Sequence, residues 1–204
     1  MPGTITIDLF LTLDGVGQAP GGPEEDPDGG FRWGGWQAPV VDEVVGEAVG
    51  DRLARTDALL LGRRTYEIFA GYWPHHTDTP IGALFDRIPK YVASRSAREL
   101  GWTGSTRIGD DLPTEVRALR DRHRDVHVIG SIDLVQTLLA EELYDELALW
   151  IHPVVLGEGK KAFPDGATPA NLRLLAPPLT AGSGAFLVRY APAGAPTTGQ
   201  MGPE

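Results

Sequence analysis

Short apolar segments alternate along this chain with longer segments whose apolar residues recur at helical spacing. The segment "DALLLG" (57–62) is almost wholly apolar, which is typical of a strand buried on both faces of a parallel sheet. The segment "SIDLVQTLLAEEL" (131–143) instead gathers its apolar residues on one helical face. Alternation of these two patterns predicts an α/β layer fold with a mostly parallel central sheet.

The same patterns predict the secondary structure of most of the chain. Strands are predicted over 4–13, 57–62, 90–96, 125–130 and 145–157. Helices are predicted over 39–55, 65–73, 79–88, 112–123 and 131–143. Residues 171–191 read as two strands around a Gly-rich turn, which predicts an antiparallel hairpin at the C-terminal edge of the sheet. Thr65 and Thr79 are the expected N-caps of the second and third helices.

Length and composition favour one domain. The chain has 204 residues, 42% of them hydrophobic, which is enough for a single well-formed core. We expect the domain to cover residues 1–191, with a Pro/Gly/Thr-rich, disordered tail over 192–204. Residues 14–36 form a long loop dense in Gly, Pro and acidic residues, expected to be a lid or pocket wall rather than a disordered insertion.

Charge and cysteine content exclude several function classes. The formal net charge of -10 argues against a nucleic-acid or anionic-membrane surface, so any anion site must be built from a few placed cations. The absence of cysteine excludes disulfides, thiolate metal sites and a cysteine nucleophile. The N-terminus does not match a signal peptide, and no apolar run reaches the roughly 18 residues of a membrane span. We therefore expect a cytoplasmic protein.

Two short segments suggest a binding motif, but the residues around them or their spacing rule it out. "GEGKKA" (157–162) resembles a dinucleotide fingerprint, but "FPDGATP" follows where a helix must begin. His75 and His76 are adjacent, so they cannot place both imidazoles on one helix face, and we predict no metal site there.

Three strand ends carry anion-binding chemistry. Glycine, serine or arginine follows each strand at the point where the chain leaves the sheet. The residues are Gly62, Arg63, Arg64 and Thr65 after the second strand, Ser94 and Arg95 after the third, and Gly130, Ser131 and Ile132 after the fourth. Helix N-termini offer free N–H groups to an anion, and arginine offers paired donors to phosphate. Since ligands of open α/β sheets bind beyond the carboxyl ends of strands, we expect the three segments to meet and hold a dinucleotide phosphate.

These segments together resemble the dihydrofolate reductase-like proteins related to the reductase domain of the bifunctional riboflavin-biosynthesis deaminase/reductase. The likeness covers residues 4–190. It rests on "LTLDGVGQAPGG", "DALLLGRRTYEIFAGYW", "KYVASRS", "VHVIGSIDLVQTLL" and "LYDELALWIHPVVLGEGKKAF". The resemblance implies a three-layer dihydrofolate reductase-like fold, with NADPH as the hydride donor for a small pterin- or pyrimidine-like substrate.

The resemblance also implies roles for single residues. Arg63, Arg64 and Thr65 match the segment for the cofactor's phosphates, and Ser94 and Arg95 match the strand end near the adenosine 2′-phosphate. The segment around the pyrophosphate and nicotinamide corresponds to Gly130, Ser131, Ile132 and Leu134, and the loop beside the nicotinamide corresponds to Asp14, Gly15 and Val16. The family often has two glycines at positions 130 and 131. Ser131 and the nearby acid Asp133 therefore put the strength of cofactor binding in question.

The substrate end of the site is less specified. Dihydrofolate reductases use a buried carboxylate on the first helix, which makes Asp42 a candidate proton donor, although an acid in a first helical turn is also explained by the helix dipole. Asp14 is the alternative candidate, and it also suits a turn before Gly15. Trp33 and Trp36 are candidates for stacking on a planar heterocycle.

Two other functions remain open from the sequence. One is a nucleotide-binding protein of the same fold without turnover. The other is an oligomeric module, most simply a homodimer, in which the apolar strand "ALWIHPVVL" (148–156) pairs across a two-fold axis.

Overall fold

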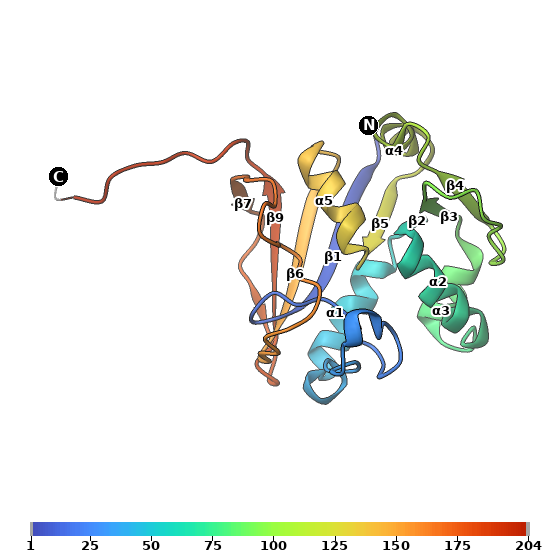
Figure 1. Cartoon of the computed structure of the whole chain (residues 1–204), viewed down its shortest axis with the longest axis horizontal. Coiled ribbons are helices and arrows are strands. Elements are labelled where there is room, and N and C mark those ends of the chain that lie inside the picture. The colour runs from blue at the N-terminus through green and yellow to red at the C-terminus, as the bar shows by residue number, and fades with distance from the viewer. Residues whose placement is uncertain (1, 203–204) are drawn as a thin grey trace.

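A computed structural model describes residues 2–202 and contains a nine-stranded sheet between two layers of helices (Figure 1). The strands are β1 (Thr4–Thr12), β2 (Ala58–Gly62), β3 (Lys90–Ala93), β4 (Ser105–Ile108), β5 (Asp125–Ile129), β6 (Glu146–His152), β7 (Leu172–Leu174), β8 (Leu179–Thr180) and β9 (Phe186–Pro192). Their order is β4-β3-β2-β5-β1-β6-β9-β7, and β8 also pairs with β9. Strands β1 to β6 pair in parallel, and every pairing of β9 is antiparallel. The predicted parallel sheet with an antiparallel C-terminal edge is confirmed.

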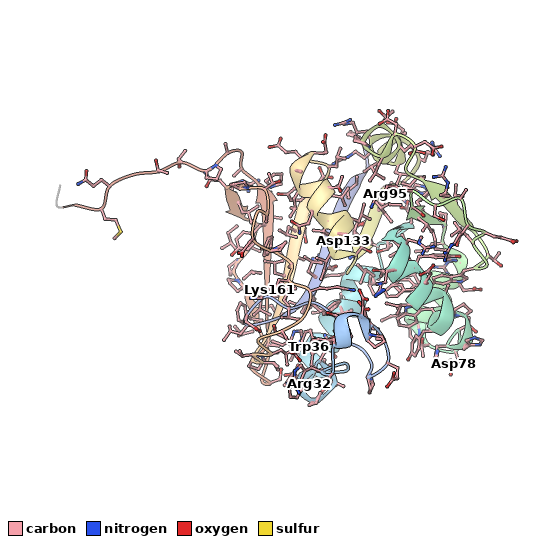
Figure 2. The ribbon with its side chains drawn as sticks, in the orientation of Figure 1. Arg32, Trp36, Asp78, Arg95, Asp133 and Lys161 are labelled. Carbon is pink, nitrogen blue, oxygen red and sulfur yellow. The ribbon has the colours of Figure 1, made fainter. Side chains whose placement is uncertain are left out.

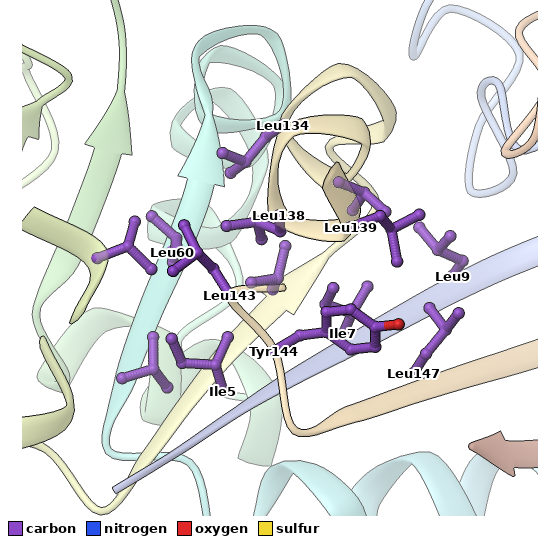
Figure 3. Packing of buried hydrophobic residues seen from close by; sticks show 14 of the residues in the cluster. Ile5, Ile7, Leu9, Leu60, Leu134, Leu138, Leu139, Leu143, Tyr144 and Leu147 are labelled. Atoms are coloured by element: carbon purple, nitrogen blue, oxygen red, sulfur yellow. The ribbon is translucent and has the colours of Figure 1, made fainter. Parts of the chain in front are cut away.

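Helices cover both faces of the sheet. The α-helices are α1 (Glu43–Leu53), α2 (Arg63–Tyr72), α3 (Pro80–Arg87), α4 (Leu112–Arg122) and α5 (Ile132–Ala140). Side chains of α4 and α5 pack with one set of strand residues, and those of α1, α2 and α3 pack with the other set. Figure 3 shows the first of these cores, where Leu134 and Leu138 lie against Leu60.

Strand β2 shows why its sequence is apolar throughout. Successive residues of a strand point to opposite faces of the sheet. Leu60 therefore joins the core beneath α4 and α5, whereas Leu59 and Leu61 join the core beneath α1, α2 and α3. All three leucines are 0% exposed, as expected for a strand with helices on both sides.

Several predicted boundaries change in the structure. The first helix begins at Glu43 rather than at Pro39, because Pro39 lies in a separate 3-10 helix (Ala38–Val40) and Asp42 caps α1. The second helix begins at Arg63, two residues before its expected cap Thr65. Strand β4 was missed, since "STRI" is too short and too polar to stand out as a strand.

The C-terminal edge also differs in detail. The segment 171–191 contains three strands, because β7 and β8 each pair with part of the longer β9. The expectation that the strand at 148–156 pairs across a two-fold axis is wrong, because β6 lies inside the sheet between β1 and β9. Residues 193–195 still hydrogen-bond to Asn171, and residues 196–202 run away from the sheet (Figure 1). Within residues 2–202, no helix has the length and hydrophobicity needed to cross a bilayer.

Candidate functional site

The carboxyl ends of β3, β2 and β5 lie side by side, because these strands are neighbours in the parallel part of the sheet. The three predicted junctions therefore meet at one edge of the sheet and line a single cleft of about 1710 Å³. A pocket for one drug-sized ligand has roughly 300–1,000 Å³, so this cleft has room for two molecules. Ten predicted residues line it: Gly62, Arg63, Arg64, Thr65, Ser94, Arg95, Gly130, Ser131, Ile132 and Leu134.

Hydrogen bonds tie two of these junctions together. The Gly62 N–H donates to Ser131 Oγ at 3.0 Å, and the Ser131 N–H donates to Thr65 Oγ1 at 3.1 Å. Ser131 has a left-handed backbone (φ 53°), and so does Gly130 before it (φ 58°). The turn after β5 is thereby held against the start of α2, which fixes the floor of the cleft at this edge.

Thr65 and Ser131 do not cap the helices that begin beside them. The hydroxyl of Thr65 accepts from Ser131, and the hydroxyl of Ser131 accepts from Gly62 and donates to the Ile129 carbonyl. The N-termini of α2 and α5 have no side-chain cap among the described residues, whereas α1, α3 and α4 are capped by Asp42, Thr79 and Asp111. The two helices that begin at the cleft are therefore the ones that keep first-turn N–H groups for an anion.

The two adjacent arginines have different partners. Arg63 forms a partly exposed pair with Glu67 one turn along α2, with Nη1 3.1 Å from Oε1. Arg64 instead reaches the long loop, where Nη1 lies 2.5 Å from Asp26 Oδ1 and 3.3 Å from Asp28 Oδ2.

Lys160 completes this group from the other side, because its Nζ lies 2.8 Å from Asp26 and 3.0 Å from Asp28. We call the four residues Asp26, Asp28, Arg64 and Lys160 the acidic clasp. Partial burial alone would raise the pKa of Asp26, but Lys160 and Arg64 outweigh it and hold that pKa below its usual value. The clasp joins the long loop to the start of α2 by ionised pairs.

The end of β3 presents exposed cations. Ser94 folds its hydroxyl onto the backbone of Ser96, accepting from its N–H and donating to its carbonyl, both at 3.1 Å. Arg95 and Arg98 are exposed and line the cleft, and neither has an ion-pair partner among the described residues. Figure 2 shows Arg95 beside the strand ends and Asp133 at the start of α5.

The long loop is hydrogen-bonded to the domain and forms one wall of the cleft. Its residues Gly17 to Asp26 and Asp28 are among the lining residues, as expected for a pocket wall. Its aromatic residues lie elsewhere, because Trp36 is buried against Val16 and Phe31, with its Nε1–H donating to the Gln18 carbonyl at 2.8 Å. Trp33 is 44% exposed beneath the Arg32 guanidinium. Val16, Trp33 and Trp36 therefore lie outside the cleft lining, and Figure 2 shows Trp36 and Arg32 well away from Arg95.

Both candidate proton donors have structural partners outside the cleft. Asp42 Oδ1 accepts the Val45 N–H at the start of α1, and its Oδ2 accepts the Ser183 N–H at 2.8 Å, which lowers the pKa of Asp42. Burial opposes ionisation of Asp14, but bonds from Thr12 and from the N–H groups of Gly157 and Leu156 lower its pKa. Neither carboxyl is among the residues that line the cleft.

Asp8 is a buried lining acid that sequence reasoning missed. It is 4% exposed and bonds to Arg52 and His127. Its Oδ1 also accepts the Trp150 indole N–H at 3.3 Å. Burial alone would raise the pKa of Asp8, but His127 and Arg52 outweigh it and lower that pKa. The signal in the sequence was a single charged residue in an otherwise uncharged strand, "TITIDLFLT".

Arg52 links Asp8 to a second acid. Its Nη1 lies 2.7 Å from Glu146 Oε1, and Arg189 holds Glu146 from the next strand. The Nη2 group of Arg52 lies 2.9 Å from Asp8 Oδ1 without the alignment that a hydrogen bond needs. Asp8 is thus saturated by protein groups and acts as an anchor beneath the cleft.

Aromatic and aliphatic side chains line the part of the cleft between β1, α1, α2 and α3. Phe10 stacks on Trp150 with ring centroids 5.9 Å apart, and Phe85 lies 5.9 Å from Phe69 and 5.2 Å from Trp73. We call the following six residues the apolar wall: Phe10, Val49, Phe69, Trp73, Phe85 and Trp150. Such a surface suits the face of a flat, apolar molecule.

Comparisons with known proteins agree with this architecture. The RibD C-terminal domain family matches residues 3–177. The uncharacterized protein YyaP of Bacillus subtilis (strain 168) is 31% identical over 180 residues, which cover 84% of this chain and 86% of that protein.

Two solved structures share the fold. One is the diaminohydroxyphosphoribosylaminopyrimidine deaminase/5-amino-6-(5-phosphoribosylamino)uracil reductase of Thermotoga maritima, with a TM-score of 0.62 and 15% identity, covering 94% of this chain and 57% of that longer one. The other is the dihydrofolate reductase of Enterococcus faecalis complexed with NADP(H) and RAB-propyl, with a TM-score of 0.56 and 16% identity, covering 94% of this chain and 98% of that one.

Proposed function

The chain belongs to the RibD C-terminal domain family, and on that premise we propose that it is a reductase that uses NADPH to reduce a small heterocycle of the pterin or pyrimidine type. The observation that carries the proposal is the pair of helix N-termini without side-chain caps, which open onto the same cleft as the exposed arginine Arg95. Family membership supports the reaction class, and the two fold neighbours, a reductase and a protein complexed with NADP(H), support the choice of cofactor.

The residues of the cleft fit a phosphorylated dinucleotide. First-turn N–H groups of α2 and α5 suit the pyrophosphate, because they are uncapped and the helix dipole favours an anion there. Arg63 and Arg64 add charge beside them, and Ser94 with Arg95 suits a 2′-phosphate at the end of β3. The cleft is large enough for the dinucleotide and a second small molecule.

Within this proposal each part of the cleft has a separate task. When bound, NADPH supplies the hydride. Ile132 and Leu134 offer an apolar surface at the start of α5, next to the turn that Gly62, Ser131 and Thr65 hold in place. The apolar wall positions the substrate and excludes water from its face. Asp8 fixes the Trp150 ring through the indole N–H.

Binding measurements test the cofactor. We expect NADPH to quench tryptophan fluorescence at micromolar concentrations, and Arg95→Ala to weaken NADPH binding about 10- to 100-fold, the equivalent of one or two lost charge-assisted bonds. Binding of NADH should change much less. Arg32→Ala is the matched control, because Arg32 is exposed on the long loop and lies outside the lining. Equal losses for NADPH and NADH would remove the 2′-phosphate assignment, and absence of binding below about millimolar would remove the cofactor.

A nucleotide-binding protein without turnover is the second candidate. The carboxylates favour it, because Asp42 and Asp14 are not among the lining residues and Asp8 is already bonded to Arg52 and His127. NADPH binding without NADPH oxidation, across a panel of pterins and pyrimidines, would support this candidate. A homodimer remains an expectation, to be checked by light scattering.

A further inference from the structure

We infer that the substrate site takes an unphosphorylated planar heterocycle that is neutral or positively charged. This inference rests on the proposed function and narrows its substrate class. It separates this chain from its Thermotoga maritima fold neighbour, whose reductase substrate carries a phosphoribosyl group.

The apolar wall offers an anion no partner. Two of its rings, Phe85 and Trp150, are 1% exposed, and Phe10, Val49, Phe69 and Trp73 are partly exposed and line the cleft. Among the described residues, the charged side chain that bonds to this wall is Asp8, through the Trp150 indole. A phosphate brought against such a surface loses its water without gaining a cation, which costs several kcal/mol.

Two acids of the long loop add to this discrimination. Glu24 and Glu25 line the cleft from the long loop. Burial raises the pKa of Glu25, and bonds from the N–H groups of Gly21 and Gly22 hold its carboxyl in place. Carboxylates in the lining repel a phosphate and attract a protonated nitrogen.

The cations of the cleft have other partners than the substrate. In the proposed function Arg63 and Arg64 serve the cofactor's phosphates, and Lys160 is paired with Asp26 and Asp28 in the acidic clasp. Arg95 and Arg98 follow β3, which is three strand spacings away from β1 and Phe10, or roughly 14 Å. The ring of a molecule stacked against Phe10 therefore lies far from these two arginines.

Paired ligands that differ by one phosphate test the inference. Riboflavin with its 5′-phosphate, and uridine with its 5′-phosphate, are titrated into the protein with and without saturating NADP⁺. We expect the neutral member of at least one pair to bind at least tenfold more tightly than its phosphate. Equal or tighter binding of the phosphates, or no binding of any of the four compounds below millimolar, would overturn the inference. Failure of NADP⁺ to bind would instead count against the proposed function, since the pairs are also compared without it.

A charge substitution at Tyr72, next to the apolar wall, gives the sharper test. Tyr72 is 51% exposed, lines the cleft and contacts Trp73 edge-to-face, so Tyr72→Lys adds a cation next to the wall without disturbing the core. We expect it to strengthen binding of riboflavin 5′-phosphate at least tenfold and to change riboflavin binding less than threefold. Tyr72→Gln is the neutral control and should change the binding of neither riboflavin nor riboflavin 5′-phosphate. No gain for the phosphate in the lysine variant would contradict a charge-based exclusion.

Discussion

Replacement of Arg52 by methionine tests the buried charges beneath the cleft. Arg52 is 8% exposed, and its Nε donates to both carboxylate oxygens of Asp8, at 3.1 and 3.3 Å, while Nη1 donates to Glu146 at 2.7 Å. Methionine keeps the apolar stem and removes the charge. Removing one partner of a buried pair costs about 3–5 kcal/mol, because the other charge stays buried without compensation. Since His127 still bonds to Asp8, and Arg189 to Glu146, we expect the lower end, about 3 kcal/mol.

The assay is urea unfolding followed by tryptophan fluorescence, with the free energy of unfolding extrapolated to water. Arg32→Met is the matched control, because the Arg32–Glu158 pair is largely exposed, with side chains 72% and 49% accessible, and such pairs contribute about 0–1 kcal/mol. An Arg52→Met variant as stable as this control would refute the reasoning, because the buried acids would then need no compensating cation.

Three further predictions follow from individual contacts. The folded-state pKa of Asp8 is lowered because His127 and Arg52 outweigh the opposing effect of burial. The stability that ionised Asp8 contributes is therefore present above the unfolded pKa of about 3.9 and is lost as pH falls through the folded value. Wild-type stability measured by urea unfolding should decline below about pH 5, more steeply than that of Asp8→Asn. Asp42→Ala should lower the free energy of unfolding by about 1–2 kcal/mol through loss of the α1 cap. NADPH binding and turnover should not change, and reduced turnover in a stable variant would restore Asp42 as a catalytic candidate. Asp28→Asn should tighten NADPH binding about two- to fivefold at low salt, and less at about 1 M salt, because one negative charge beside Arg64 is removed. Equal affinities of the wild type and the variant at low salt would show that the acidic clasp does not compete with a phosphate.

Local sequence pattern predicted the sheet and the edge that carries the site. A wholly apolar strand such as Leu59–Leu61 is stable when helices cover both faces of its sheet. Sheets buried in this way are mostly parallel, so the strand predicts parallel neighbours. The strand-end residues Gly62, Ser94 and Gly130 met as expected, because the carboxyl ends of parallel strands share one edge.

Helix starts were predicted less well, because a capping residue can have another use. Thr65 and Ser131 have the right chemistry for caps, but their hydroxyls bond to the neighbouring junction instead. This exchange crosses from residue 65 to residue 131, so no local pattern contains it. It leaves the two cleft-facing helix N-termini without side-chain caps, which is the feature that supports the cofactor proposal.

The sequence by itself determined the layer fold, the edge of the sheet that carries the cleft, and most residues of the candidate cofactor site, because each follows from periodicity and from residues next to a strand end. Tertiary structure decided the fate of the charged residues. Asp42 became a helix cap and Arg64 became part of the acidic clasp. Asp8 became the buried anchor of Trp150 and Arg52. The physical reason is that a charge takes its role from the partners that folding brings within hydrogen-bonding distance, and these lie from 3 to 142 residues away along the chain.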